Sequence, residues 1–439
     1  MTHCVGAYSA SGAQSDDRGS AAPAHSSDGG DPAAAASHAS VVIGDATLYR
    51  ADCRDVLRDR APESADSIVC DPPYNLTGGR PGGRSAATSG AVMRGFMGLE
   101  WDATGIAYDP ALWRECLRVL KPGAHLLAFG GTRTAHRMVC AIEDAGFEIR
   151  DSILWLYGSG FPKSKNLTGE RQGWGSALKP AHEPIVLARK PLAERTLEAN
   201  VARYGTGALN IDACRVPTSE NLSGGDCSAA AAGVRHPGWA RPWMEDRSAV
   251  AAHAARCRDN VARAEVLGRW PANVIHDGST EVLAAFPEAP GQCADAKLAN
   301  ELKTSRVYGA MRRERGDEPS ANSENTGAVG FKMRPGTRRL DAGTAARFFY
   351  CAKASRADRG EGNSHPTVKP TALMAHLCRL VTPPGGMVLD PFTGSGSTGV
   401  AAVREGLRFI GIEAQAAYLE IARQRIALEH GGQMDLLWA

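Results

Sequence analysis

The sequence predicts an α/β protein built around a mostly parallel sheet. Apolar segments of strand length alternate with helical patterns up to about residue 190, and the alternation resumes at Thr371. The segment Ala65 to Cys70 is apolar at its end, which is typical of a parallel strand covered on both faces. With 439 residues and 43% hydrophobic content, the chain can bury a large core, either as one domain with insertions or as two domains.

The first part of the chain alternates between strand and helix patterns. Pro110 opens a helix, and the Lys-Pro-Gly sequence that ends at Gly123 predicts its stop. The expected elements are a hairpin or strand from Ser40 with a helix beginning at 52–55, a strand at 65–70, a helix at 110–123, a strand at 124–131, a helix at 134–147 and a strand at 148–158.

The alternation stops between about Pro191 and Asp358, where Gly, Pro, Asn and Arg are frequent. We interpret this stretch as an inserted, irregular domain. Residues 1–40 are rich in Ala, Ser, Gly and Asp, so we expect a disordered tail there. After the insert, the pattern predicts a helix and a strand within 371–392, a helix at 396–406, a strand at 407–413 and a helix at 416–430.

Charge and cysteine content exclude several classes of protein. The formal net charge of +2 is too small to indicate a nucleic-acid partner, although a chain with a balanced total charge can still have a local basic face. The eleven cysteines are scattered without a Cys-x-x-Cys spacing, which predicts reduced thiols and no metal site. We find neither a signal-peptide pattern nor an apolar run of membrane-spanning length, so we expect a cytoplasmic protein.

A glycine-rich turn follows a predicted strand near the end of the chain. In VLDPFTGSGSTG, Gly394, Gly396 and Gly399 have the G-x-G-x-x-G spacing, and Glu413 ends the next strand. Open α/β sheets bind ligands at such turns, and an acid at the position of Glu413 suits ribose hydroxyls. The pattern predicts a nucleoside cofactor, while the absence of G-x-x-x-x-G-K-[ST] argues against a nucleoside triphosphatase.

Asp390, at the entrance to this turn, favours one class of nucleoside. Its carboxylate would repel the pyrophosphate of NAD. S-adenosylmethionine has no phosphate, and it carries an amino group and a sulfonium whose positive charges a carboxylate attracts. We therefore expect S-adenosylmethionine as the cofactor. An NAD-dependent oxidoreductase that uses the same turn is the alternative from another class.

The sequence Asp-Pro-Pro-Tyr directly follows the strand at 65–70. The amino nitrogen of adenine is a poor nucleophile because its lone pair is delocalised into the ring. The Asp71 carboxylate and the Pro72 carbonyl can each accept one amino hydrogen, which turns the lone pair toward a methyl donor. Pro72 and Pro73 fix the backbone, and Tyr74 offers a ring on which an unstacked base can lie.

Together these motifs resemble those of the DNA amino-methyltransferases, which methylate adenine N6 or cytosine N4. The most specific pieces are DPPY and VLDPFTGSG, and the resemblance covers about residues 40–190 and 345–430. DPPY comes first, followed by a long insert, HPTVKP and the glycine loop, an order similar to the permuted beta group. The segments LLAFGGTRTAHR, LYGSGFPKS and LKPAHEPIVLARKP look like those of prophage-associated and orphan members.

The resemblance implies an S-adenosylmethionine-dependent, Rossmann-like doubly wound sheet that is circularly permuted and carries an inserted target-recognition domain. It implies duplex DNA as the partner, and it leaves open a homodimer and a restriction endonuclease partner. The implied parts are a disordered tail at 1–40, a catalytic half at 41–190, a target-recognition region at 191–345, a cofactor-binding half at 346–430 and a C-terminal tail at 431–439.

The resemblance also assigns roles residue by residue. Asp52 has two interpretations, a contact with the adenine of the cofactor or an N-cap of the following helix. In the family a lysine often stands next to the tryptophan that is Trp155 here, whereas this chain has Leu156. The implied site comprises Asp71, Pro72, Pro73 and Tyr74 around the base, Asp390, Phe392, Gly394 and Gly396 around the methionine part of the cofactor, Glu413 at its ribose, and His365, Thr367 and Lys369 at its carboxylate end.

A basic segment offers contacts to DNA. Residues 331–359 hold eight basic side chains against two acidic ones, which suits phosphate binding. The expected contacts are Lys332, Arg334, Arg338 and Arg339. By the resemblance, the acid of DPPY favours adenine N6, because cytosine N4 enzymes often carry serine there. Cytosine N4 methylation remains an alternative, as does a DNA-binding protein without catalysis.

Overall fold

The computed structural model describes residues 38–76, 100–161, 164–218, 246–288, 301–305, 309–313, 343–353, 355–360 and 362–437. The chain divides into Met1–Ser37 and a unit from His38 to Ala439. The predicted N-terminal tail up to residue 37 lies outside the described residues. The fold and the site below belong to the second unit.

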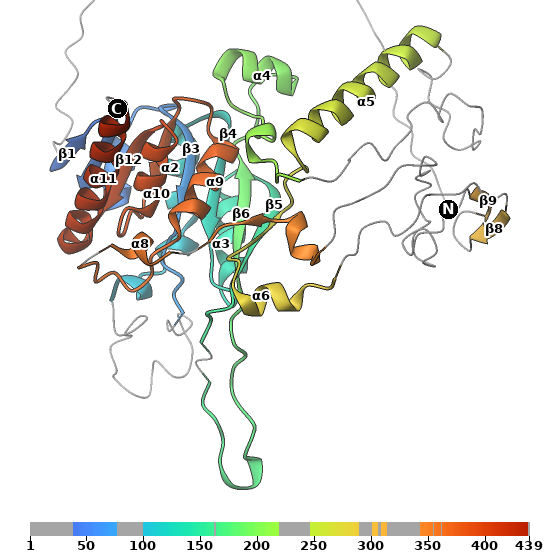
Figure 1. Ribbon diagram of the computed structural model, residues 1–439. Helices are drawn as coiled ribbons and strands as arrows, with labels where there is room; N and C mark the ends of the chain where they lie inside the picture. Colours follow the sequence, from blue (N-terminus) through green and yellow to red (C-terminus); the bar gives the residue numbers. More distant parts are fainter. Residues whose placement is uncertain are drawn as a thin grey trace, which may run out of the picture. The chain divides into compact units, whose positions relative to one another are not determined.

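A ten-stranded sheet organises this unit (Figure 1). Five strands that are neighbours in the sheet, β2, β12, β11, β3 and β4, run parallel to one another. The next strand, β6, is antiparallel to both of its neighbours, and β5, β7 and β10 run parallel to one another. In spatial order they are β1 (Ser40–Ile43), β2 (Ala46–Arg50), β12 (Arg408–Glu413), β11 (Met387–Asp390), β3 (Ala65–Cys70), β4 (Leu120–Phe129), β6 (His182–Arg189), β5 (Glu148–Leu156), β7 (Val274–His276) and β10 (Tyr350–Cys351). A separate pair is formed by β8 (Glu301–Ser305) and β9 (Gly309–Arg313).

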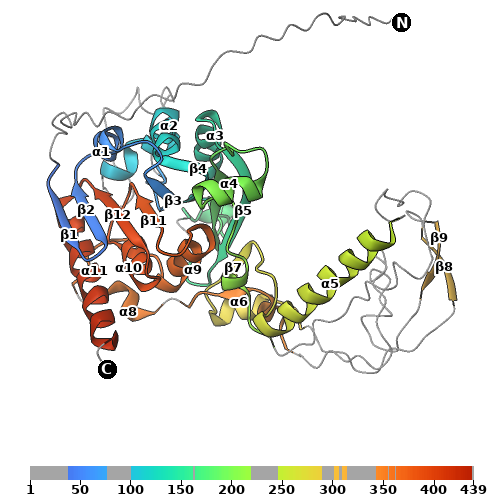
Figure 2. The ribbon, with the colours of Figure 1, turned by 90° about the horizontal axis from the view of Figure 1, so that it is seen from above.

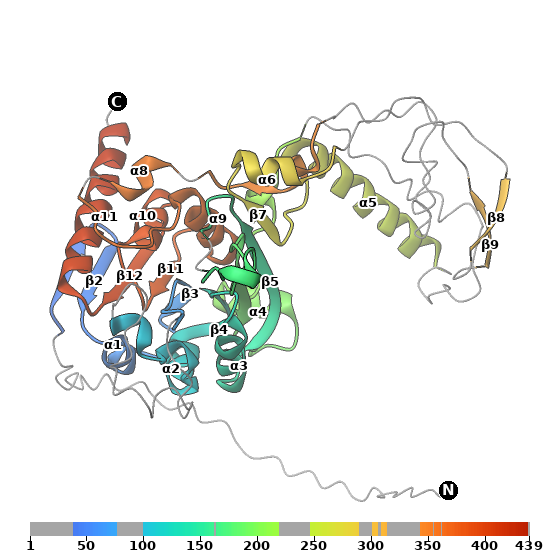
Figure 3. The same ribbon diagram turned by 90° about the horizontal axis from the view of Figure 1, so that it is seen from below.

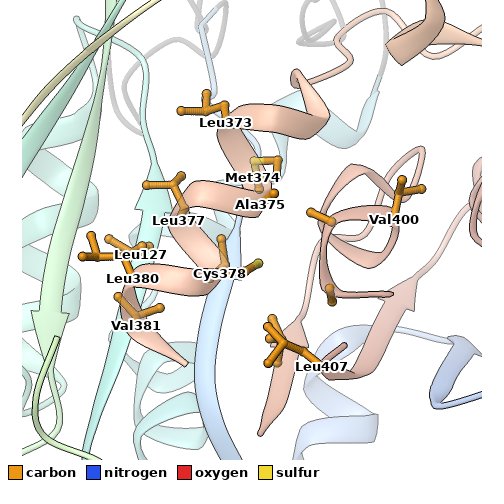
Figure 4. Close-up of a cluster of buried hydrophobic side chains, with 14 of the residues drawn as sticks. Leu127, Leu373, Met374, Ala375, Leu377, Cys378, Leu380, Val381, Val400 and Leu407 are labelled. Atoms are coloured by element: carbon orange, nitrogen blue, oxygen red, sulfur yellow. The ribbon is translucent and has the colours of Figure 1, made fainter. Parts of the chain in front are cut away.

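Helices cover both faces of the sheet, as Figure 3 shows. On one face lie α1 (Cys53–Asp59), α2 (Pro110–Val119) and α3 (Ala135–Asp144), and on the other lie α9 (Thr371–Val381), α10 (Ser397–Arg404) and α11 (Ala416–Leu437). Successive residues of β4 alternate between the two cores: Leu126 packs with α1 to α3, whereas Leu127 packs with α9 (Figure 4). This confirms the α/β sheet buried on both faces.

The strand order brings two distant motifs together. Figure 2 shows β11, from the end of the chain, between β12 and the early strand β3. β11 is parallel to β3, and Leu389 pairs with Ile68. The glycine turn and DPPY therefore leave neighbouring strands at the same edge of the sheet. The circular permutation is a statement about relatives and stays a prediction.

The described part of the predicted insert is more regular than expected. It contains α4 (Leu197–Tyr204), α5 (Arg247–Leu267) and α6 (Thr280–Ala285), so the expectation of irregular structure was wrong there. The alanine-rich α5 has good intrinsic helix propensity without an apolar stripe, which is why its pattern did not stand out. The remaining short elements are η2 (Glu100–Ala103), η3 (Ile106–Tyr108), η4 (Gly169–Arg171), η5 (Asp212–Cys214), η7 (Ala345–Phe348) and α8 (Arg356–Arg359).

Part of the predicted insert also packs with the main sheet. β7 extends the sheet beside β5, and the buried Asn200 of α4 donates hydrogen bonds to the carbonyls of Pro122 and Thr206, at 2.9 and 2.8 Å. A strand of three residues gains its pairing only from an existing edge, so sequence periodicity does not reveal it.

Two predicted boundaries were wrong. α2 ends at Val119 and β4 begins at Leu120, so the Lys-Pro-Gly sequence lies inside the strand. The expected C-terminal tail from residue 431 is helical, because α11 continues through Gly431 to Leu437. A glycine costs a helix only about 1 kcal/mol relative to alanine, which weakens an established helix without ending it.

Candidate active site

A cavity of about 1380 Å³ opens at the carboxyl ends of the parallel strands. Among the predicted catalytic and cofactor residues, only Gly396 does not line it. The twelve that do are Asp52, Asp71, Pro72, Pro73, Tyr74, His365, Thr367, Lys369, Asp390, Phe392, Gly394 and Glu413. The described residues contain no cluster of three or more His, Cys, Asp or Glu able to hold a metal, and none of their helices is long and apolar enough to cross a membrane.

Glu413, one of the two acids predicted beside the glycine turn, accepts hydrogen bonds from backbone amides there. The Gly394 amide donates to Glu413 Oε2 at 2.9 Å, and the Gln415 amide donates to Glu413 Oε1 at 2.7 Å. A carboxylate oxygen can accept a second hydrogen bond, so Glu413 keeps acceptor capacity toward the cavity. At Gly394 a Cβ atom would lie 3.1 Å from His365 Nε2, so the absence of a side chain keeps this wall open.

Gly396 serves packing rather than the cavity. Its φ of +80° lies in the left-handed region, and a Cβ atom there would be 2.8 Å from the Cβ of Ala422 in α11. The second glycine of the motif is therefore explained by the close approach of the start of α10 to α11.

Asp390 is 2% exposed, and its Oδ1 accepts a 2.9 Å hydrogen bond from the Phe392 amide. Burial raises the pKa of Asp390 to about 7, although hydrogen bonds from the Thr398 side chain and the Phe392 amide oppose the shift. A carboxyl group with a pKa near 7 is only partly ionised at neutral pH, and a cation that approaches it favours the charged form.

We expect this shift to make the ligand-free protein lose stability as the pH rises. The folded state binds the Asp390 proton more tightly than the unfolded chain, so the stabilisation is present at about pH 4 and is lost as the pH approaches 7. Relative to Asp390→Asn, the free energy of unfolding should fall by up to about 4 kcal/mol across that window. Urea denaturation of both proteins at stepped pH measures the difference, and a flat difference would contradict the assignment.

His365, Thr367 and Lys369 line the same cavity as Glu413. His365 is buried, its ring stacks on Trp101 with centroids 6.2 Å apart, and Nδ1 lies 2.6 Å from the Thr367 carbonyl oxygen. Burial lowers the pKa of His365, which keeps the ring neutral near pH 7. Thr367 itself is exposed at the cavity surface.

Lys369 does not lie beside the glycine turn but at the centre of the DPPY cluster. Its Nζ is 2.9 Å from Asp71 Oδ2, 2.9 Å from Glu183 Oε2 and 3.1 Å from the Tyr74 hydroxyl oxygen. Burial alone would lower the pKa of Lys369, but the two carboxylates more than offset it and raise the pKa above its ordinary value. The ammonium is therefore a permanent counter-charge in this wall.

The backbone of DPPY is supported by Asp102. Its two carboxylate oxygens accept hydrogen bonds from the amides of Asn75 and Leu76, at 2.9 and 3.2 Å. Asn75 has a φ of +52°, and its side chain accepts a 2.8 Å hydrogen bond from the Gly105 amide. The Tyr108 hydroxyl donates to the Tyr74 carbonyl at 2.9 Å. These bonds hold the loop in one conformation without using the Asp71 side chain.

One oxygen of Asp71 stands out. Oδ2 contacts Lys369, whereas Oδ1 is buried and has no hydrogen-bond partner among the residues that the structure describes. A buried acceptor without a partner is costly, and in a cavity wall it indicates that a bound molecule supplies the donor.

Asp52 has both of the roles that the sequence allowed, whereas the predicted DNA contacts are not described by the structure. Asp52 lines the cavity and is also the N-cap of α1, because its Oδ1 accepts a 2.9 Å hydrogen bond from the Arg54 amide. The ion pair with Arg54 lowers the pKa of Asp52. The expected DNA contacts Lys332, Arg334, Arg338 and Arg339 lie outside the described residues.

Comparison with known proteins decides the family. The model of the N6/N4 group, described as DNA methylase, matches residues 65–424. The chain belongs to this DNA methylase family. The chain is 52% identical over 66 residues to the Type II methyltransferase M2.DpnII of Streptococcus pneumoniae, which is 15% of this chain and 25% of that relative. It is 45% identical over 62 residues to M2.LlaDCHI of Lactococcus lactis subsp. cremoris, which is 14% of this chain and 23% of the relative.

The chain thus spans about a quarter of the length of the curated relatives it matches. Among solved structures, one described as the M1.HpyAVI–SAM complex matches 87% of this chain and 98% of its own chain, with a TM-score of 0.37 and 15% identity.

Sequence reasoning missed Glu183 and Asp102. Glu183 is the second residue of β6, and an acid near the start of an otherwise apolar strand was an available signal. Asp102 lies in a single turn of 3₁₀ helix after a long glycine-rich stretch, and no local pattern indicated it.

Proposed function

We propose that this DNA methylase transfers a methyl group from S-adenosylmethionine to the N6 amino group of adenine in duplex DNA, after the base has turned out of the helix. The observation that carries the proposal is Asp71 Oδ1, a buried acceptor without a partner among the described residues, in a cavity shared with the glycine turn. An adenine amino group has two hydrogens to donate, and this oxygen can accept one of them.

The residues present fit the cofactor. Glu413 has spare acceptor capacity for ribose hydroxyls, Gly394 leaves room for the ligand, and Asp390 is a carboxyl that a cation would charge. When bound, S-adenosylmethionine supplies an electrophilic methyl group on its sulfonium. The acidic side chains beside the turn disfavour the pyrophosphate of NAD, so the oxidoreductase is the weaker alternative.

The chain's own contribution is to hold the amino group. Asp71 Oδ1 and the Pro72 carbonyl would accept its two hydrogens and direct the lone pair toward the glycine turn. Lys369 fixes the Asp71 carboxylate through Oδ2, and its raised pKa makes it a positioning cation rather than a base. The Tyr74 hydroxyl is held between Lys369 and Glu183, at 3.1 Å from each, which fixes the orientation of the ring available to the base.

Cytosine N4 is the second candidate acceptor, because it also presents an exocyclic amino group. The acid at position 71 supports adenine by the resemblance described above. A protein that binds DNA without catalysis would have no use for an unpaired Asp71 oxygen next to a cofactor turn. Duplex DNA is the proposed partner, while the homodimer and the restriction endonuclease remain predictions.

The test is single-molecule sequencing of genomic DNA from a methylation-free host that expresses the full chain. We expect modified adenines within one short motif, and none in a culture that expresses Asp71→Ala at equal level. Modified cytosines would transfer the proposal to N4. Unmodified DNA, from protein that binds S-adenosylmethionine, would overturn it.

A further inference from the structure

Between β5 and β6 the chain leaves the sheet as a long hairpin, described over residues 157–161 and 164–181, which we call the β5–β6 arm (Figure 1). Its base is tied to the sheet, because the Tyr157 amide donates a 3.0 Å hydrogen bond to the Ala181 carbonyl. Toward the tip, the Leu167 amide donates to the Trp174 carbonyl at 2.8 Å. Ser164 and Ser176 add cross-strand bonds to backbone amides at 2.9 and 2.8 Å.

The apolar side chains of the arm have no cover within the described part of the chain. Every residue from 165 to 179 is exposed. Trp174 is 65% exposed, Leu178 is 92% exposed and Phe161 is 80% exposed. An isolated two-stranded hairpin is marginally stable in water, so an arm of this kind is best explained by a partner that covers it.

Charge identifies the partner. Among its described residues the arm carries three basic ones, Lys165, Arg171 and Lys179, against the single acid Glu170. The Arg171 guanidinium lies 5.9 Å from the centroid of the Trp174 ring, so a cation and an exposed aromatic face stand together near the tip. Basic side chains with an aromatic ring among them match a nucleic-acid backbone and its bases.

Position agrees with charge. β5 ends at the same edge of the sheet as β4 and β3, since β4 and β5 are both antiparallel to β6. Phe161, Leu178 and Lys179 at the base of the arm line the same cavity as Asp71. A surface that begins at the proposed base pocket and continues outward faces the nucleic acid on either side of the target.

We propose that the β5–β6 arm binds the duplex next to the target base, with its basic residues on phosphates and Trp174 against a base or sugar. This inference rests on the proposed function. From Gly158 to the tip at Gly169 an extended strand spans at most about 36 Å, which is close to one turn of B-DNA. The arm therefore reaches contacts within about one helical turn of the target.

The experiment measures affinity for a duplex of about 30 base pairs, roughly three turns of B-DNA, by fluorescence anisotropy at several salt concentrations. Arg171→Ala combined with Lys179→Ala should weaken binding at least tenfold and reduce the slope of log affinity against log salt by about 2. Trp174→Ala should weaken binding about tenfold and leave the salt slope unchanged, because stacking releases no counterions.

The matched control is Arg58→Ala combined with Arg423→Ala, an exposed arginine on α1 and an arginine on α11 whose side chain is 42% exposed. It removes the same charge, and we expect wild-type affinity and salt slope. All variants should keep the wild-type thermal midpoint and affinity for S-adenosylmethionine, which shows that the fold is intact.

The arm proposal is overturned if the arm variants bind the duplex like the control, or if they change the oligomeric state in sedimentation and leave DNA affinity unchanged. Its outcome is separable from that of the proposed function, since affinity does not depend on methyl transfer. A wild-type protein that binds duplex through the arm and methylates nothing would refute the activity alone.

Discussion

Replacing Asp71 by alanine should lower the rate of methyl transfer by about 10³-fold, because a hydrogen-bond partner aimed at the reacting group contributes about 10²–10³ to the rate. The expected mechanism of the loss is specific. The amino group loses its acceptor at Oδ1, while the glycine turn, Glu413 and Asp390 are untouched. Transfer of labelled methyl groups to duplex DNA under single-turnover conditions measures the rate directly.

Two controls separate this loss from a failure to bind or fold. Affinity for S-adenosylmethionine and for the duplex should stay near the wild-type values in Asp71→Ala. Asp71→Asn loses the charge that Lys369 contacts but keeps the size of the side chain and one carbonyl oxygen as an acceptor. It should therefore retain more activity than Asp71→Ala. Wild-type transfer by Asp71→Ala would refute the role given to this carboxylate.

Lys369→Met should destabilise the ligand-free protein by about 3–5 kcal/mol, the cost of removing one partner from a buried ion pair. Only 8% of the Lys369 side chain is exposed, and its ammonium lies between Asp71 and Glu183. Without it, two carboxylates share a cavity wall with no counter-charge. The free energy of unfolding in urea at neutral pH is the measurement.

The same substitution at Lys121 is the matched control. Lys121 contacts Asp66 at 2.6 Å, but its side chain is 31% exposed, and Asp66 keeps a 2.7 Å hydrogen bond from the Met387 amide. Lys121→Met should therefore cost clearly less. Adding Glu183→Gln to Lys369→Met should recover part of the lost stability, because one uncompensated charge disappears. Equal losses at Lys369 and Lys121 would show that the buried cluster has no special energetic role.

Much of the site was predictable because its motifs are local. The glycine spacing predicted a ligand-binding turn at Gly394 with Glu413 close by, and in the structure both residues line one cavity. DPPY follows β3 directly, so its place at the carboxyl end of a strand follows from the apolar run before it. The alternation of strands and helices predicted the α/β sheet. The ends of α2 and α11 were wrong, because Lys-Pro-Gly and Gly431 resemble helix stops, whereas the structure places the first inside β4 and the second inside α11.

The partners of the DPPY residues were not predictable in the same way. Lys369 stands four residues after His365 in HPTVKP, yet the two side chains serve different walls of the cavity. Glu183 meets Lys369 only because β6 pairs with β4 and so begins at the carboxyl edge of the sheet.

By itself, the sequence determined the two strand-to-loop turns and the type of residue in each, since turn geometry, proline rigidity and glycine spacing are local properties of the chain. Only the tertiary structure decided that the turns leave neighbouring strands at one edge of the sheet, that Lys369 pairs with Asp71, and that Asp71 Oδ1 has no partner among the described residues. The physical reason is that strand order sets which distant residues are neighbours, and the burial that follows sets their charge states and unpaired atoms.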